Sequence, residues 1–357
     1  YEHVELEGDE IGTQFNSVGT DFRAEFKHRP FGSVEGAVGV QYKDVDFEAL
    51  GEEAFVPPSV TKQTSFFIFE EWQPADLWTL QASARVENQQ IDAPGLPDYD
   101  ENAAGASVGI IRDIGDEYSI AFNYALTQRH PNATELYADG AHVAVQRIER
   151  GSVSLGNGIL DKELSSNVDI TFRGKTSRVE WAVTAFLNDI DDYILLSPTG
   201  TEEDEVAVYD YLQTDARLYG VEAEARIELL ESAAGHLHTR LFTDYVRGED
   251  TSTGGNLPRI TPWRYGIGLH YTRDKFAAAV DATFSAEQDE IAENELPTDS
   301  YTLIGAEVSY AFERPDVFVF LRGTNLTDED ARQHTSPLKD TIPLPGRSLQ
   351  LGLSFNF

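Results

Sequence analysis

The sequence predicts an all-β protein, a transmembrane antiparallel β-barrel with a polar lumen. Two features carry this prediction: apolar and polar side chains alternate along almost the whole chain, and short and long connections follow each other regularly. Residues 348–357 show the alternation most clearly, because Leu or Phe occupies every second position up to Phe357. Successive side chains of a strand lie on opposite faces, so one face of this segment suits lipid and the other suits water.

Alternation and turn residues divide the chain into about sixteen strands of one domain, residues 1–357, with a short first strand. Short connections lie near residues 29–32, 73–76, 113–117, 174–177, 231–235, 272–275 and 313–316. Longer connections lie near residues 7–12, 47–61, 92–102, 129–161, 197–205, 248–259, 288–298 and 325–346. Outer-membrane barrels have short periplasmic turns and longer extracellular loops, so we expect both ends of the chain on the periplasmic side.

The alternation also assigns a face to each residue of a strand. In residues 179–187 the odd positions are apolar and face lipid, whereas Glu180 and Thr184 face the lumen. Residues 219–227 and 276–284 repeat this pattern. A soluble β-sandwich also alternates, but it does not combine a regular short and long loop rhythm with an aromatic terminal strand, so we favour the barrel over the sandwich.

Composition excludes several other classes of protein. The chain has 27 Lys and Arg against 62 Asp and Glu, a formal net charge of −35, which disfavours a nucleic-acid partner. It has no Cys, which excludes a disulfide framework, a thiolate metal site and a Cys nucleophile. It lacks hydrolase, phosphate-binding and dinucleotide motifs, so we expect neither an enzyme nor a bound cofactor. The absence of Met and the start at Tyr1 indicate a processed chain or a fragment.

Much of the acidic charge lies in two predicted loop segments, residues 201–205 and 287–295. Charge runs usually form solvated, self-repelling surfaces, and this is the interpretation we favour. A mouth that attracts cations is the alternative, including calcium in these loops or divalent-ion bridges to lipopolysaccharide.

A resemblance to a known family emerges from six stretches. Residues 129–142, RHPNATELYADGAH, precede Glu149-Arg-Gly and then LDKELSSN at 160–167. This order closely resembles the part of TonB-dependent outer-membrane receptors where an Arg-x-Pro, Glu-Leu-Tyr, Gly-x-His segment precedes a Leu, Glu-x-Ser-x-Asn strand. Residues 51–58, 257–262 and 323–347 agree with the same family. The His-Thr-Ser-Pro-Leu-Lys-Asp form of residues 334–340 is most similar to its zinc-uptake branch.

The resemblance implies an outer-membrane receptor for a scarce nutrient, with zinc, another metal or a metal chelate such as a siderophore as the leading ligands. Such receptors have an N-terminal plug, which contacts TonB, inside a barrel of about 22 strands. This chain would then be the C-terminal part of the barrel, with the plug and early strands missing. Outer-membrane lipid, lipopolysaccharide, the TonB complex and the barrel assembly machinery are the implied partners, and the bacterial outer membrane is the implied location.

Two alternatives from other classes remain. Sixteen strands could close alone into a passive, porin-like diffusion channel, because the number is even and both ends lie on the same side. The chain could also be a surface barrel without a transport role.

The candidate metal ligands are histidines and carboxylates of two predicted extracellular loops, because neutral imidazole and carboxylate groups suit zinc. They are His130, Glu135, Asp139 and His142 in the first loop, and His334 and Asp340 in the last. The structural alternative is that His130 and His142 belong to a loop motif found in the family irrespective of substrate. Neither spacing matches a closed zinc motif.

A second histidine cluster is predicted from the facing of two neighbouring strands. His236, His238 and Arg240 share the lumen face of one strand, and His270 lies on the same face of the next. Antiparallel pairing across loop 248–259 would place His238 near His270, close to the periplasmic end. The alternative role for these residues is contact with the plug or with water.

Overall fold

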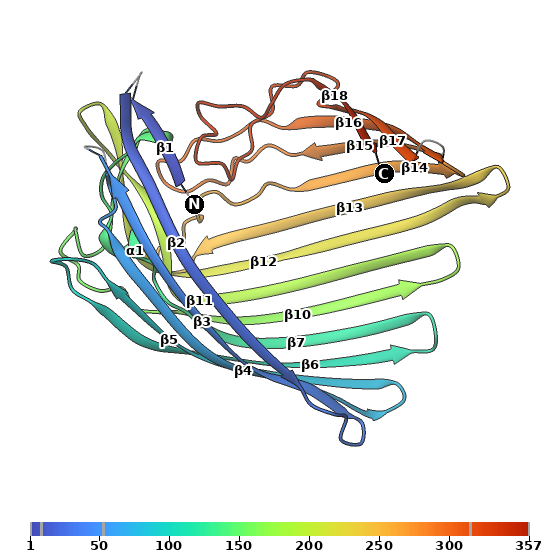
Figure 1. The fold of residues 1–357 in the computed structure, drawn as a ribbon, viewed down its shortest axis with the longest axis horizontal. Helices are drawn as coiled ribbons and strands as arrows, with labels where there is room; N and C mark the ends of the chain where they lie inside the picture. Colours follow the sequence, from blue (N-terminus) through green and yellow to red (C-terminus); the bar gives the residue numbers. More distant parts are fainter. Residues whose placement is uncertain (1, 8–9, 52–53, 314–315, 356–357) are drawn as a thin grey trace.

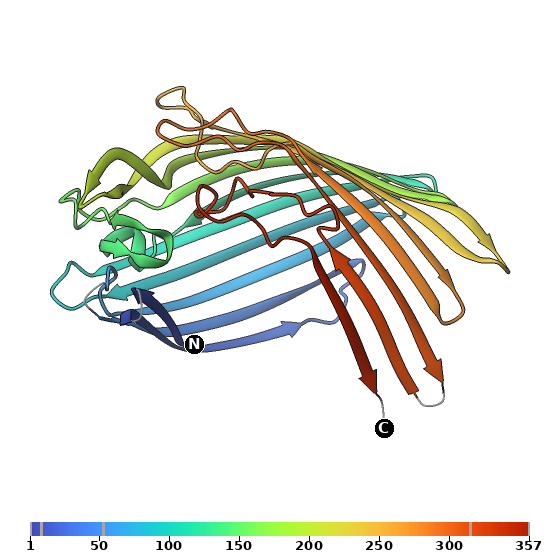
Figure 2. The same cartoon turned by 90° about the horizontal axis from the view of Figure 1, so that it is seen from above.

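The computed structural model describes residues 2–7, 10–51, 54–313 and 316–355, so the terminal Phe357 lies outside the described part. The strands form one sheet that curves into a long trough (Figures 1 and 2). The first half of the sheet comprises β1 (Glu2–Glu7), β2 (Glu10–Lys27), β3 (Val34–Leu50), β4 (Ser59–Ala75), β5 (Trp78–Asp92), β6 (Tyr99–Ile114), β7 (Tyr118–Arg129), β8 (Asp139–His142) and β9 (Arg147–Arg150). The second half comprises β10 (Glu163–Lys175), β11 (Val179–Glu203), β12 (Val206–Ser232), β13 (Gly235–Asp250), β14 (Arg264–Arg273), β15 (Phe276–Ser285), β16 (Tyr301–Glu313), β17 (Asp316–Thr324) and β18 (Ser348–Phe355).

The wall of the trough is an antiparallel meander. Each wall strand pairs with the next one in sequence, and β7 pairs with β10 across the segment that contains β8 and β9. The described residues form 18 strands, of which β8 and β9 have four residues each and lie within this connecting segment, so the other sixteen make up the wall. The prediction of an antiparallel all-β sheet with about sixteen strands is confirmed.

One long edge of the trough is β18, and the other is β2 with the short β1 paired along its residues 10–16 (Figure 2). The described register pairs β18 with β17, and β2 with β1 and β3. Outward apolar residues are more exposed on these strands than in the middle of the sheet: Val18 is 74% exposed and Leu349 70%, against 39% for Val183 and 40% for Leu187. A neighbouring strand covers part of each outward side chain in the middle of the sheet, and this cover is smaller at its edges.

The strand limits follow the predicted rhythm of short turns and long loops, with one clear difference. The polar and acidic composition of residues 197–205 predicts a long loop, yet β11 extends to Glu203 and β12 begins at Val206. Ladder pairs such as Glu202 with Ala207 continue the hairpin past two irregularities in register. Polar composition therefore marks the part of this hairpin beyond the apolar band, where the hydrogen-bonded ladder persists.

Close cross-strand contacts explain two glycines of the wall. A Cβ atom at Gly39 would lie 2.2 Å from the ring of Phe67 on β4, and one at Gly352 would lie 2.1 Å from the ring of Phe320 on β17. Each aromatic ring therefore lies over the backbone of the neighbouring strand, where only a residue without a side chain fits.

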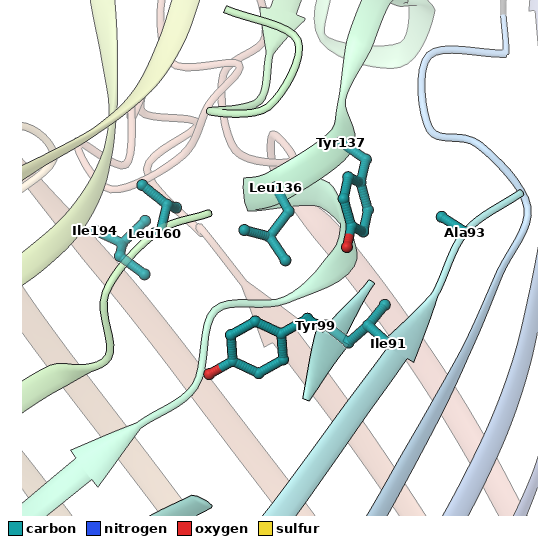
Figure 3. Close-up of a cluster of buried hydrophobic side chains, with 7 residues drawn as sticks. All are labelled: Ile91, Ala93, Tyr99, Leu136, Tyr137, Leu160 and Ile194. Atoms are coloured by element: carbon teal, nitrogen blue, oxygen red, sulfur yellow. The ribbon is translucent and has the colours of Figure 1, made fainter. Parts of the chain in front are cut away.

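The segment between β7 and β10 folds back against the wall at the long-loop end. It contains the single described α-helix, α1 (Ala133–Tyr137), which begins with a capping box formed by Asn132 and Glu135. Side chains of α1 pack against β5 and the start of β6 in the cluster of Figure 3, which comprises Ile91, Ala93, Tyr99, Leu136, Tyr137, Leu160 and Ile194. On its other side, β9 pairs in parallel with residues 207–210 of β12.

Within the described residues, no helix is long and apolar enough to cross a membrane.

Candidate functional site

Charged side chains at the start of segment 129–162 form ion pairs that attach the segment to the wall. The guanidinium of Arg129 donates to both carboxylate oxygens of Glu163, at 2.6 and 2.7 Å, and to Glu135 at 3.1 Å. Glu135 also accepts the backbone N–H of Asn132. The carboxylates of Glu135 and Glu163 are both largely buried, and the guanidinium of Arg129 neutralises their charge.

His130 lies next to this ion-pair network and is 7% exposed. Its Nδ1 lies 2.7 Å from the hydroxyl of Tyr99. Burial lowers the pKa of His130 below its usual value, which favours the neutral imidazole.

His142 forms a second network around Glu149, which is almost fully buried. Its Nδ1 lies 2.9 Å from the Glu149 carboxylate, and its ring stacks on Phe55 at a centroid distance of 4.4 Å. Arg147 and Tyr211 also donate to Glu149, at 2.7 and 3.2 Å. Burial alone would raise the pKa of Glu149, but the hydrogen bond from His142 and the charge of Arg147 outweigh burial and hold it below its usual range.

The last long loop contains a third network, which connects it to two other loops. Glu295 accepts from Lys339 Nζ at 2.8 Å and from the backbone N–H of Arg259 at 2.9 Å, and it lies 3.1 Å from Nε2 of His334. The hydroxyl of Thr298 lies 3.0 Å from Nδ1 of the same imidazole. Burial would raise the pKa of Glu295, but these partners lower it to about 2.

The six predicted loop ligands fall into two groups, one held in buried networks and the other exposed to solvent. His130, Glu135, His142 and His334 are engaged in these networks, whereas Asp139 and Asp340 are exposed. Across the described ranges, no three His, Cys, Asp or Glu residues are grouped in a way that could hold a metal ion. The metal role of the six loop residues stays a prediction.

A small pocket of about 50 Å³ lies between the loops at the long-loop end. Its polar and aromatic lining residues include Arg147, Tyr209, Arg259, Asn294, Lys339 and Asp340. Sequence reasoning found Asp340 but missed Arg259, although residues 257–262 were among the family-like stretches. The acidic run 287–295 predicts a solvated surface, yet the side chain of its last residue, Glu295, is buried among partners from another loop.

The second histidine cluster forms as the strand facing predicts. His238 is in register with His270, and their rings stack at a centroid distance of 5.0 Å and an angle of 7°. His270 Nε2 lies 3.1 Å from Asp281 on β15. His236 is in register with Thr272, two pairs closer to the short turn, and is exposed.

The stacked histidines line a cavity of about 1060 Å³ at the short-turn end. Arg173, Arg226 and Arg240 line the same cavity, together with acidic residues of the turns such as Asp116. The proposed ligand role of His236, His238 and His270 remains a prediction, because this neighbourhood also fits contact with a further segment or with water.

Curated relatives of the chain are vitamin B12 transporters by name. It is 25% identical over 175 residues to the vitamin B12 transporter BtuB of Photobacterium profundum, which covers 49% of this chain and 28% of that protein. It is also 22% identical to the vitamin B12 transporter BtuB of Vibrio cholerae over 292 residues. This alignment covers 80% of this chain and 41% of that protein. The chain therefore spans less than half the length of these relatives.

Solved structures share the fold. The copper transporter OprC superimposes with a TM-score of 0.82 at 18% identity, over 97% of this chain and 57% of that protein. The FrpB iron transporter from Neisseria meningitidis (F3-3 variant) gives 0.70 at 14% identity, over 96% and 55%. The siderophore receptor PirA from Acinetobacter baumannii gives 0.69 at 16% identity, over 98% and 56%.

One family model matches most of the chain. Residues 5–326 match the model described as TonB dependent receptor-like, beta-barrel. The family groups receptors and transporters, not enzymes, and its members are β-barrel proteins of the bacterial outer membrane. The chain therefore belongs to the TonB-dependent receptor-like β-barrel family.

Proposed function

We propose that this chain is the barrel part of an energised outer-membrane receptor that takes up a scarce nutrient, with zinc, another metal or a metal chelate as the ligand. The family match over residues 5–326 is the observation that carries the proposal. Proteins named for copper, iron and siderophore transport share its fold, which supports a metal or a chelate. Zinc itself rests on the resemblance of residues 334–340 to the zinc-uptake branch.

We further propose that the sixteen wall strands are the C-terminal part of a barrel of about 22 strands that also holds a plug. The span of 57% of the copper transporter supports this, and so do the exposed edges at β2 and β18. An unpaired strand edge in lipid leaves backbone N–H and C=O groups without partners, which costs several kcal/mol per group. Further strands between these edges would remove this cost.

The proposed partners follow from this arrangement. Lipid and lipopolysaccharide would surround the outward apolar face, and the plug would connect the barrel to the TonB complex, which supplies energy. The barrel assembly machinery would receive the chain through its last strand. Calcium in the acidic loops stays part of the proposal, and no bound cofactor is needed for transport of this kind.

Within this proposal, the exposed carboxylates are the better placed of the six loop candidates for first contact with a metal. Asp139 and Asp340 lie at the surface, whereas Glu135 and His334 would have to leave buried ion pairs before they could bind one. Replacement of Asp139 and Asp340 by Asn is therefore expected to weaken zinc binding without unfolding the loops.

The uptake proposal is tested in cells that carry the full-length receptor. Deletion of its gene should lower uptake of labelled zinc or of a ferric siderophore, and deletion of TonB should lower uptake to the same degree. Uptake of every tested metal and chelate at the normal rate in the deletion strain would overturn the proposal.

A passive diffusion channel is the second candidate. The even number of wall strands favours it, because such a sheet can close on itself. Swelling of liposomes that contain this chain, in sugar solutions of increasing size, would support the channel. A surface barrel without transport would show neither swelling nor uptake.

A further inference from the structure

The pocket between the loops, lined by Arg147, Tyr209, Arg259, Asn294 and Asp340 among others, is assembled from parts far apart in sequence. Arg147 lies on β9 and Tyr209 on β12, while the other three lie in the loops after β13, β15 and β17. Figure 2 shows these loops gathered at one end of the trough. Loops positioned by a rigid sheet are a common setting for binding sites, and this pocket lies where a ligand from outside would arrive.

The charges that line the pocket fall into two groups. Two of its cations are neutralised by buried carboxylates, since Arg147 pairs with Glu149 at 2.7 Å and Lys339 pairs with Glu295 at 2.8 Å. Within the described part of the chain, the guanidinium of Arg259 and the carboxylate of Asp340 make neither an ion pair nor a side-chain hydrogen bond. One positive and one negative group are therefore left for a ligand in a chain whose net charge is −35.

The backbone on two sides of the pocket is held in an uncommon conformation. Arg259 has φ +58° and Asn294 has φ +62°, in the left-handed region that few residues other than glycine adopt. The N–H of Arg259 donates to the buried Glu295, which fixes this conformation. Such strain persists where surrounding contacts enforce it, and here the same carboxylate that receives Lys339 also fixes the position of Arg259.

We propose that this pocket binds a carboxylate that is joined to a positive centre. Arg259 takes the carboxylate, because a guanidinium donates two parallel hydrogen bonds to that group. Asp340 faces the positive centre. Two kinds of ligand carry this chemistry, a carboxylate chelate of a divalent metal and an ammonium carboxylate such as an amino acid. A pocket of about 50 Å³ holds one such group, not the whole of a large ligand.

This inference rests on the proposed function for one point only, that the long-loop end faces outward. It deepens that function because the group recognised is a carboxylate joined to a positive centre and not a bare metal ion. It also gives Arg259 a role that the metal-ligand prediction did not contain.

Isothermal titration of the purified chain in detergent tests the proposal with zinc citrate, glycine, citrate alone and zinc alone. We expect zinc citrate or glycine to bind at least about tenfold more tightly than citrate alone, and Arg259→Gln to weaken this binding by about ten- to a hundredfold. Binding of zinc citrate but not glycine identifies the chelate, and the reverse result identifies the zwitterion. Asp340→Asn should remove the preference over citrate alone.

The matched control is Arg217→Gln, because Arg217 is also an arginine near the long-loop end but is ion-paired with Asp189 at 2.6 Å and lies outside the pocket. This control should bind like the unchanged chain, and circular dichroism should show the same strand content for every variant. Equal binding by Arg259→Gln and the unchanged chain would overturn the proposal, and so would a failure of both zinc citrate and glycine to bind more tightly than citrate alone. A failed uptake assay would leave these titrations unaffected, so the two proposals fail separately.

Discussion

At the scale of single residues, the loops at the mouth are held by buried ion pairs. Glu295 connects the loops after β13, β15 and β17 through Arg259, His334 and Lys339. Breaking a buried pair by removal of one partner leaves an uncompensated charge, which costs far more than the loss of an exposed pair. Glu295 and Lys339 are 6% and 5% exposed, so this argument applies to them.

Replacement of Lys339 by Met should therefore loosen all three loops. We expect a local cost of about 3–5 kcal/mol, because Glu295 would stay buried without its cation. Amide hydrogen exchange of residues 286–300 and 325–347 measures this effect. The control is Lys175→Met, since Lys175 pairs with Glu180 at 73% and 59% exposure, and its exchange pattern should not change. Unchanged protection in Lys339→Met would contradict the assigned role.

The same network predicts a response to acid. The pKa of Glu295 is lowered from 4.5 to about 2, so its stabilisation is fully present above pH 4.5 and is lost as the pH falls through 2. The stabilisation at stake is about 3 kcal/mol, because one pKa unit corresponds to about 1.4 kcal/mol. Exchange of residues 286–300 between pH 5 and pH 2 should show the loss, and Glu295→Gln should remove this pH dependence.

These contacts also show where sequence reasoning stops at the residue scale. Alternation assigned Thr184 and Asp281 to their faces because a strand has a fixed period of two. It did not predict the burial of Glu295, because an acidic run suggests solvent and the partners His334 and Lys339 are distant in sequence. Only the folded loops bring them together.

At the scale of strands, the wall depends on pairs in which an aromatic ring covers a glycine. The sequence alone shows a glycine in a strand as a weak point, whereas the register shows which ring needs its space. The pairs Gly39 with Phe67 and Gly352 with Phe320 join neighbouring strands at opposite edges of the sheet. The extension of the β11–β12 hairpin to Glu203 was missed for a related reason, because ladder hydrogen bonds do not depend on apolar side chains.

Gly352→Ala should destabilise the last two strands. The new Cβ would lie 2.1 Å from the Phe320 ring, and forcing atoms into a packed contact typically costs about 1–3 kcal/mol. Urea unfolding in lipid vesicles measures the loss. Gly305→Ala on β16 is the control, because its nearest atom, the carbonyl oxygen of Gly323, lies 3.5 Å away. Equal stability of the two variants would show that the ring moves aside freely.

At the scale of the whole molecule, the sheet and its facing were predictable, and its function was only partly so. A period of two and the loop rhythm follow from membrane physics, which acts on every strand in the same way. The networks at the mouth combine residues from different loops, such as Glu149 with Tyr211 and Glu295 with Lys339, and no local pattern in the sequence encodes these pairs. The substrate of the chain therefore stays a proposal.

The assignment of lipid and lumen faces can be tested at this scale, because arginine substitutions at neighbouring residues of one strand should differ in their effect on stability. Val183 lies on the outward face of β11 and is 39% exposed, whereas Thr184 faces inward and contacts Thr171 across the strand pair at 2.9 Å. Val183→Arg should destabilise the barrel in vesicles by about 2–4 kcal/mol, because an outward arginine near the midplane meets hydrocarbon. Thr184→Arg should cost less, because its side chain reaches the water of the lumen and the carboxylate of Glu222, which is in register with Thr184. A larger loss for Thr184→Arg would reverse the assignment of lipid and lumen faces for the whole sheet.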